Sequence, residues 1–249
     1  MKGKDKKIMT LIAVTQSNYI PWKGYFDIID ACDHVVLLDN VQYTRRDWRN
    51  RNKIKTPQGL KWLTIPVNVS GKYANLRISE VEVSDPLWAE KHWSMIHQNY
   101  HKSPKFQEIE GWLKKLYEKA SSLKFLSEIN RLFLEEICKY LDIQTTFSWS
   151  TDSYSIEELD SFSSTERLLK LAQKYNATDY LTGPLATNYM DVKMFEDREI
   201  SVLWANYDNY SEYPQIHGDF CHGVTILDMF FMLGKDTKRY MKGRTIINS

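Results

Sequence analysis

Short apolar runs and helical patterns alternate at both ends of the chain. Residues 11–15 and 34–38 are apolar runs typical of buried strands, and WKGYFDIIDACD between them repeats apolar residues at helical spacing. A strand, a helix and a second strand in this order predict a βαβ unit with parallel strands. Near the C-terminus the pattern predicts, in order, a helix, a strand, a helix, a strand and a final helix, at residues 165–175, 179–181, 188–195, 200–204 and 222–233.

The middle of the chain has a longer helical pattern. Two further strand candidates are followed by three segments with apolar residues three or four positions apart, at residues 62–67, 78–83, 87–100, 106–120 and 123–141. A polar linker, TDSYSIEELDS, then leads into the C-terminal pattern. We therefore predict a single α/β domain over residues 1–249, with a Rossmann-like, mainly parallel sheet and a helical insertion at residues 86–142.

Composition narrows the class of protein. The chain has 249 residues, 43% of them hydrophobic, with 33 basic and 32 acidic side chains. These values indicate a globular protein with a full core, and the near-neutral charge argues against a protein that coats nucleic acid or membranes. The longest uncharged apolar stretch, residues 9–14, is too short to cross a bilayer, and MKGKDKKIMT lacks the apolar segment of a secretory signal. We expect a cytoplasmic protein that does not bind membranes.

The cysteines and histidines do not predict a metal site. Cys32, Cys138 and Cys221 are odd in number and show no CxxC spacing, which argues against a disulfide framework or a cysteine zinc site. His97 and His101 are four residues apart in a predicted helix, but the glutamate of an HExxH motif is missing. We predict no metal and no cofactor.

One segment concentrates positive charge in this balanced chain. YTRRDWRNRNKIK, residues 43–55, carries six basic groups among aromatic and amide side chains. Because guanidinium groups bind phosphate through paired hydrogen bonds, we assign Arg46 and Arg51 to phosphate binding. Asn50 and Asn52 are candidates for further contacts to sugar or phosphate. The segment predicts an anion site.

Two other interpretations of this basic segment remain open. Its charges can face water as an ordinary solvated loop. Alternatively, Tyr43 and Trp48 can stack on RNA bases between the arginines. The near-zero net charge of the whole chain favours a small phosphorylated ligand, such as a sugar nucleotide, over RNA.

The loop after the first predicted strand, QSNYIPWKGY, gathers polar and aromatic side chains before a predicted helix. Gln16, Tyr19, Trp22 and Tyr25 are candidate ligand contacts there. Hydrogen-bonding groups beside a helix N-terminus can hold a nucleotide, with the helix dipole meeting the phosphate. A strand-to-helix turn with packed aromatics explains the same residues equally well. The loop contains neither GxGxxG nor a P-loop motif.

Two later loops add candidates. TGPLATNYMD follows a predicted strand, and YPQIHGDF precedes the final helix; their candidate ligand residues are Gly183, Asn188, Tyr189, Asp191 and Gln215. His217 is the first candidate for a general base because histidine titrates near neutrality, although an ordinary loop histidine is the simpler interpretation. Asp39, at the end of a predicted strand, is the second candidate. SSTERLL at residues 163–169 predicts a capped helix start.

Taken together, these segments resemble the WbqC-like protein family. The resemblance rests on QSNYIPWKGYF, LDNVQYTRRDWRNRNKI, KWLTIPV, KHWSMIHQNYHKSPKF, SSTERLL, YLTGPLATNYMD and YPQIHGDF, in this order over nearly the whole chain. The shared polar and aromatic positions are Gln16, Tyr19, Trp22, Tyr25, Asp39, Tyr43, Arg46, Asn50, Arg51, Asn52, Lys91, Asn99, Tyr100, Gly183, Tyr189, Asp191 and Gln215. Because the family occurs with genes for bacterial surface polysaccharides and some natural products, the resemblance implies work on sugars or nucleotide-activated sugars.

The combined hypothesis is a transferase acting on a nucleotide-activated or amino sugar, by acyl or aminoacyl transfer. A single positioned base, His217 or Asp39, can serve this reaction without a metal or a redox cofactor. One alternative is ATP-dependent nucleotidyl transfer or ligation. Another is a noncatalytic module that binds a sugar nucleotide or RNA.

Overall fold

The strands predicted at both ends of the chain form a five-stranded parallel sheet together with one strand that was not predicted, β5 (Thr146–Trp149). The computed structural model describes residues 9–69 and 76–247; residues 1–8, part of the segment that we expect not to be a secretory signal, lie outside this range. The strands are β1 (Leu11–Thr15), β2 (His34–Leu37), β5 (Thr146–Trp149), β6 (Asp179–Thr182) and β7 (Ser201–Trp204). Their order is β5-β2-β1-β6-β7, and all neighbours pair in parallel. The predicted Rossmann-like α/β fold is confirmed.

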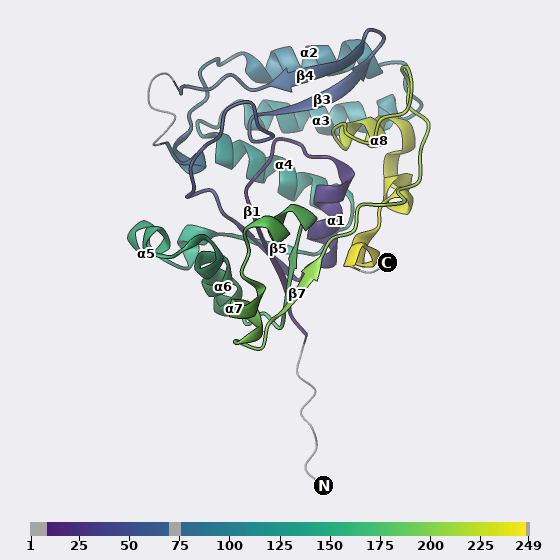
Figure 1. Cartoon of the computed structure of the whole chain (residues 1–249). Coiled ribbons are helices and arrows are strands. Elements are labelled where there is room, and N and C mark those ends of the chain that lie inside the picture. The colour runs from purple at the N-terminus through teal and green to yellow at the C-terminus, as the bar shows by residue number, and fades with distance from the viewer. Residues whose placement is uncertain (1–8, 70–75, 248–249) are drawn as a thin grey trace.

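Alternate residues of these strands enter two cores on opposite faces of the sheet. Val35 and Leu37 belong to the core that contains α1 (Lys23–Ala31), whereas Val36 belongs to the core that contains α6 (Ser164–Lys174). Figure 1 shows α6 and α7 (Val192–Glu196) on one side of the sheet and α1 on the other. Both faces are therefore covered, as expected for buried parallel strands.

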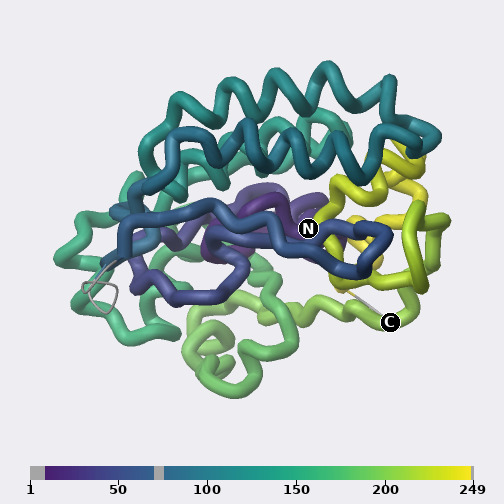
Figure 2. The backbone as a smooth tube through the Cα atoms, turned by 90° about the horizontal axis from the view of Figure 1, so that it is seen from above, coloured from purple at the N-terminus to yellow at the C-terminus, as the bar shows by residue number. Residues whose placement is uncertain are grey.

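The middle of the chain builds a second layer over the same sheet. It consists of the hairpin β3 (Arg51–Thr56) and β4 (Gly59–Thr64), followed by α2 (Trp88–Tyr100), α3 (Phe106–Ala120) and α4 (Leu126–Tyr140). Viewed from above, the hairpin crosses beside these helices, and the C-terminal segment with α8 (Leu227–Leu233) lies next to it (Figure 2). The main chain of Thr225 donates to the carbonyl of Lys53, 2.9 Å away, which ties the C-terminal segment to the hairpin.

Several local predictions were wrong or incomplete. Residues 78–83 are not a strand: η2 (Ile78–Glu80) is a 3-10 turn in which the Glu80 carboxylate accepts from the main-chain N–H of Arg77. The strand predicted at 62–67 is β4, three residues earlier, and the final helix begins at Leu227 rather than at 222. Strands β3 and β5 were not predicted. Both are short and contain charged or polar residues, so neither shows a clear alternation of apolar and polar positions.

The polar linker also folds. It forms η3 (Ser150–Asp152) and α5 (Ile156–Ser161), and the Ser155 side chain caps α5 by accepting from the N–H of Glu158. Further 3-10 turns are η4 (Pro184–Asn188), η5 (Gly234–Tyr240) and η6 (Gly243–Ile247). Over residues 9–69 and 76–247, no helix is both long and apolar enough to cross a membrane.

Candidate functional site

A pocket opens where the strand order changes direction. From β1 the chain builds the sheet outward through β2 to β5, then returns to place β6 on the other side of β1. Ligands of open α/β sheets bind at the carboxyl ends of the strands at such a point. The cavity there, the switch-point pocket, has a volume of about 330 Å³. Its polar or aromatic lining residues are Thr15, Gln16, Asn18, Tyr25, Arg49, Tyr180, Thr182, Tyr189 and Tyr207.

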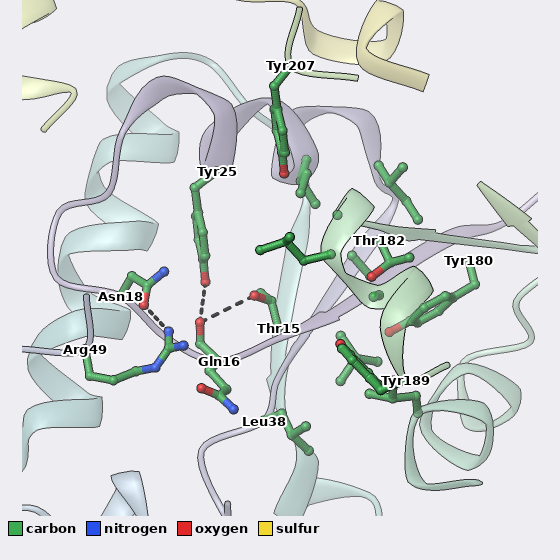
Figure 3. A pocket seen from close by; sticks show the side chains of 18 residues that line it. Thr15, Gln16, Asn18, Tyr25, Leu38, Arg49, Tyr180, Thr182, Tyr189 and Tyr207 are labelled. Carbon is green, nitrogen blue, oxygen red and sulfur yellow. Dashed lines mark hydrogen bonds between the residues drawn. The ribbon is translucent and has the colours of Figure 1, made fainter. Parts of the chain in front are cut away.

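Arg49 supplies the positive charge of this pocket. Its guanidinium donates to the side-chain oxygen of Asn18 and to the carbonyl of Ser17, 3.4 Å away. Asp47 lies 3.6 Å from the same group. Figure 3 shows Arg49 and Asn18 on one side of the cavity and Tyr189 on the other, with Gln16 between them. Arg49 is thus held by two neutral oxygens and one carboxylate, and the remaining N–H groups of a guanidinium in a concave site can bind an anion such as phosphate.

A buried polar cluster holds the loop that carries Gln16 and Asn18. We call Ser17, Asp39, Arg49 and Asn130 the Ser17 cluster. The main-chain N–H of Ser17 donates to Asp39 Oδ1 at 2.8 Å. Asn130, on α4, donates to Ser17 Oγ at 3.1 Å and to the Arg49 carbonyl at 2.9 Å. Segments that are far apart in sequence are thus joined directly behind the pocket.

The Ser17 cluster is not fully paired. Asp39 Oδ2, Arg49 Nε and Asn130 Oδ1 are buried without a hydrogen-bond partner in the described part of the chain. Burial raises the pKa of Asp39, although hydrogen bonds from Ser17 and the charge of Arg49 oppose the shift. Unpaired buried polar atoms cost stability, so their concentration beside a pocket marks this region as a functional candidate.

The raised pKa of Asp39 leads to a prediction about stability. A raised pKa means that the folded protein favours the protonated carboxyl, so stability is lost as the pH rises through the folded-state pKa. Asparagine keeps the oxygen that accepts from Ser17 and carries no charge. We expect Asp39→Asn to be at least as stable as the wild type at pH 8, with the difference shrinking as the pH falls. Urea unfolding at pH 8 and pH 5 measures this, and a less stable variant at pH 8 would contradict it.

Two further tyrosines, Tyr25 and Tyr207, line the switch-point pocket. Tyr25 donates to the main-chain carbonyl of Gln16 at 2.8 Å, and burial raises its pKa. Burial and the nearby charge of Asp27 raise the pKa of Tyr207 to about 12. Both phenols are therefore neutral at pH 7. Tyr189 is 60% exposed at the pocket edge, and Gly183 directly follows β6, where an added Cβ would lie 3.5 Å from the Tyr207 hydroxyl.

A second cavity, the tryptophan pocket, lies next to the first and shares Asn18 with it. Its volume is about 400 Å³. The lining residues are Asn18, Pro21, Trp22, Trp48, Asn52, His222 and Gly223. Two of the predicted ligand residues, Trp22 and Asn52, therefore line a cavity.

Several predicted ligand residues instead stabilise the fold. Tyr19 is fully buried, with its hydroxyl 2.9 Å from His92 Nδ1 and 2.7 Å from the Tyr117 hydroxyl. It offers no free ring face, so the structure gives no support to Tyr19 as a stacking residue. Tyr43 is buried as well, and the Asn50 amide donates to the Ile65 carbonyl at 2.9 Å.

The basic segment divides into parts with different surroundings. Arg46 is exposed, with a positive φ of 58°, and its carbonyl accepts from the Arg51 guanidinium. The Arg51 guanidinium lies 4.0 Å from the centre of the Trp62 ring. Neither arginine lines one of the two pockets described above. The geometry therefore moves the best candidate for phosphate binding from Arg46 and Arg51 to Arg49.

Neither pocket is lined by the predicted general base His217 or by two of the predicted ligand residues, Gln215 and Asp191. His217 Nε2 lies 2.9 Å from the Asn99 carbonyl of α2, and His217 lines neither pocket. Gln215 stabilises its own loop, because its side-chain oxygen accepts a hydrogen bond of 2.8 Å from the main-chain N–H of Cys221. Asp191 caps α7 by accepting from the N–H of Lys193 at 3.1 Å, which explains this residue structurally.

Two further residues of the predicted loops lie at helix ends. Asn188 is exposed at the end of η4. Ser163 caps α6 by accepting from the N–H of Glu166 at 3.2 Å, as its sequence predicted. Within residues 9–69 and 76–247, no group of three or more histidine, cysteine or acidic side chains is arranged to hold a metal ion.

Comparison with known proteins places this site in a family. The sequence profile of the WbqC-like protein family matches residues 16–240, a span that contains Arg49 and all residues lining the tryptophan pocket. The chain belongs to the WbqC-like protein family. It is 42% identical over 234 residues to a protein of Mycobacterium tuberculosis (strain ATCC 25618 / H37Rv) named uncharacterized protein Rv1507c, covering 94% of this chain and 98% of that relative. No solved structure matches the chain.

Several site residues of this WbqC-like protein were not singled out from the sequence, among them Arg49, Asn130 and His222. Arg49 is one of six similar basic groups, Asn130 is a polar residue within an amphipathic helical pattern, and His222 stands at the expected start of the final helix. An amide on the apolar face of a predicted helix is the only signal that marked Asn130. Nothing local distinguished Arg49 from its neighbours.

Proposed function

We propose that this WbqC-like protein is a transferase of bacterial surface-polysaccharide or natural-product biosynthesis that acts on a nucleotide-activated or amino sugar. The observation that carries the proposal is the switch-point pocket, in which the Arg49 guanidinium meets amide and hydroxyl groups at the carboxyl ends of β1 and β6. Arginine suits phosphate, and dense hydroxyl and amide groups suit the hydroxyls of a sugar. The family's association with polysaccharide genes supports the same substrate class.

Acyl or aminoacyl transfer is the reaction that these side chains serve best. Asp39 lines neither pocket, but it is hydrogen-bonded to the loop that lines the switch-point pocket, and one of its oxygens has no partner among the described residues. Its raised pKa makes it a stronger base than an ordinary carboxylate, which suits a group that accepts a proton from an attacking amine or hydroxyl. The acceptor's nitrogen or oxygen would bond to the acyl carbon of an activated ester or thioester, whose leaving group departs with the bonding electrons. Arg49 would hold the phosphates of the sugar nucleotide in place during this step.

A ligand screen tests the proposal. A ligand present at 100 times its dissociation constant adds about 2.7 kcal/mol of stability, a shift that thermal unfolding detects readily. The screen compares sugar nucleotides, ATP with Mg²⁺, and short RNA. We expect stabilisation by a sugar nucleotide. Stabilisation by ATP with Mg²⁺ alone would favour nucleotidyl transfer or ligation, and stabilisation by RNA alone would favour a binding module; either result would overturn the proposal.

A further inference from the structure

The tryptophan pocket is a separate chamber on the other side of Asn18 from the switch-point pocket. We infer that it binds the nucleobase of a nucleotide ligand whose phosphates lie toward Arg49. The inference rests on the proposed function, because it divides the same sugar nucleotide between two neighbouring cavities. It assigns the aromatic ring to Trp22 and Trp48 and leaves the sugar to the hydroxyl-rich switch-point pocket.

The walls of the chamber are flat aromatic rings held from behind. Trp22 lies against the first turn of α1, where a Cβ on Gly24 would overlap its indole ring. Its ring centre is 5.2 Å from that of Tyr207. The Trp48 ring is 42% exposed, and its centre lies 5.4 Å from that of Trp62. Both indoles are thus packed against neighbouring groups, and both line the chamber.

The polar groups of the chamber are few, which decides between a nucleobase and a sugar ring. The Asn52 amide donates to the carbonyls of Tyr19 and Ile20, at 3.2 and 2.8 Å. Asn18 has its side-chain oxygen occupied by Arg49, and only its NH₂ group remains available. A pyranose carries hydroxyls around its whole rim and would lose hydrogen bonds to water here. A nucleobase has apolar faces for stacking and a short polar edge.

His222 lines the same chamber, so its ring can contact that edge. Burial lowers the pKa of His222, and the Lys23 charge lowers it further. At neutral pH the ring is therefore uncharged, with one nitrogen that donates and one that accepts. With the Asn18 amide, His222 supplies the few directed contacts that a heterocycle needs.

The surrounding charge favours a phosphorylated heterocycle. Lys53 Nζ lies 5.8 Å from the Trp48 ring centre and 4.9 Å from that of Trp62. Arg49 lines the neighbouring pocket and donates to Asn18, which the two pockets share, so two basic side chains lie near a ligand stacked on Trp48. A neutral ring alone would gain little from this field, whereas a nucleoside diphosphate gains from both the stacking and the charge.

The test separates stacking from phosphate binding. Isothermal titration calorimetry measures wild-type binding to ADP, CDP, GDP, UDP and dTDP and to inorganic pyrophosphate. We expect Trp48→Ala to weaken binding of the preferred nucleoside diphosphate on the order of 10- to 100-fold while leaving pyrophosphate binding unchanged. Trp48→Phe, which keeps an aromatic face, should restore most of the affinity. Trp93→Ala is the matched control, because Trp93 lies on α2 and lines neither of the two pockets.

Each outcome has a separate meaning. Loss of nucleoside diphosphate affinity in Trp48→Ala, with recovery in Trp48→Phe, supports the nucleobase site. Unchanged affinity in Trp48→Ala, or equal losses for pyrophosphate and the nucleotide, would overturn it while leaving sugar-nucleotide binding in the switch-point pocket intact. Failure of the wild type to bind any sugar nucleotide, nucleoside diphosphate or pyrophosphate would overturn both the inference and the proposed function.

Discussion

Arg49→Ala is expected to weaken binding of a sugar nucleotide by about 1.5–3 kcal/mol, which corresponds to roughly 10- to 150-fold in the dissociation constant. The reason is that Arg49 is the arginine that lines the switch-point pocket, where it is fixed against Asn18 and the Ser17 carbonyl. Charge-assisted hydrogen bonds from a positioned guanidinium are among the stronger polar contacts. Isothermal titration calorimetry with the sugar nucleotide identified by thermal shift measures the effect.

Two companion variants make this prediction specific. Arg46→Ala removes an exposed arginine three positions away that does not line the pocket, and we expect nearly unchanged affinity. Arg49→Lys keeps the charge but loses the paired geometry, so an intermediate loss is expected. Equal losses of affinity in Arg46→Ala and Arg49→Ala would indicate that the basic segment attracts the ligand only through its overall positive charge. That result would contradict the assignment of Arg49. Circular dichroism checks that each variant remains folded.

The second large effect concerns acid stability and centres on His92. Burial lowers the pKa of His92 to about 4 from an ordinary value of 6.5. Its Nε2 donates to the Thr64 carbonyl at 3.1 Å, because a carbonyl only accepts, and its Nδ1 then accepts from the Tyr19 hydroxyl at 2.9 Å. Both ring nitrogens of His92 are therefore used in hydrogen bonds that require the neutral imidazole.

The sign of the pH dependence follows from the lowered pKa. Stability from His92 is fully present above about pH 6.5 and is lost as the pH falls toward 4, because the unfolded chain binds the proton more readily. One pKa unit corresponds to about 1.4 kcal/mol, so the loss is on the order of 3 kcal/mol. Guanidinium unfolding at a series of pH values between 7.5 and 4 measures it.

His92→Gln should flatten this pH dependence, even though the variant is less stable at neutral pH. His101→Gln is the control, since His101 lies at the exposed end of the same helix and should keep the wild-type slope. An unchanged slope in His92→Gln would show that other groups dominate acid unfolding. Asp39 cannot supply this slope, because its raised pKa acts in the opposite direction.

The helices were the best predicted elements. The ends of α3 agree with the predicted 106–120, α2 begins one residue later than predicted, and α6 begins and ends one residue earlier than predicted. Their long amphipathic patterns carry the signal over three or more turns. Strand β3 was missed because RNKIKT has charged residues at alternate positions, so its apolar face appears only once it is paired with β4.

The sequence identified the loops that line the candidate site, but not which of their side chains face the cavities. Gln16, Trp22, Tyr25 and Tyr189 do line the two cavities. Tyr19, three residues from Gln16, points the opposite way into the core between α2 and α3, where it meets His92 and Tyr117. A loop has no fixed repeat that assigns each side chain to a face, so its composition alone does not separate ligand contacts from packing.

By itself, then, the sequence determined the parallel α/β architecture, the order of its main helices, the capped start of α6 and the edge of the sheet where loops collect. These features depend on local periodicity and on residues within one turn of each other. Only the tertiary structure decided that Arg49 rather than Arg46 or Arg51 enters the pocket, and that Asn130 holds Ser17 from 113 positions away in the chain. Such contacts are set by how distant segments pack, because the free energy of burying and pairing a side chain depends on neighbours that no local pattern encodes.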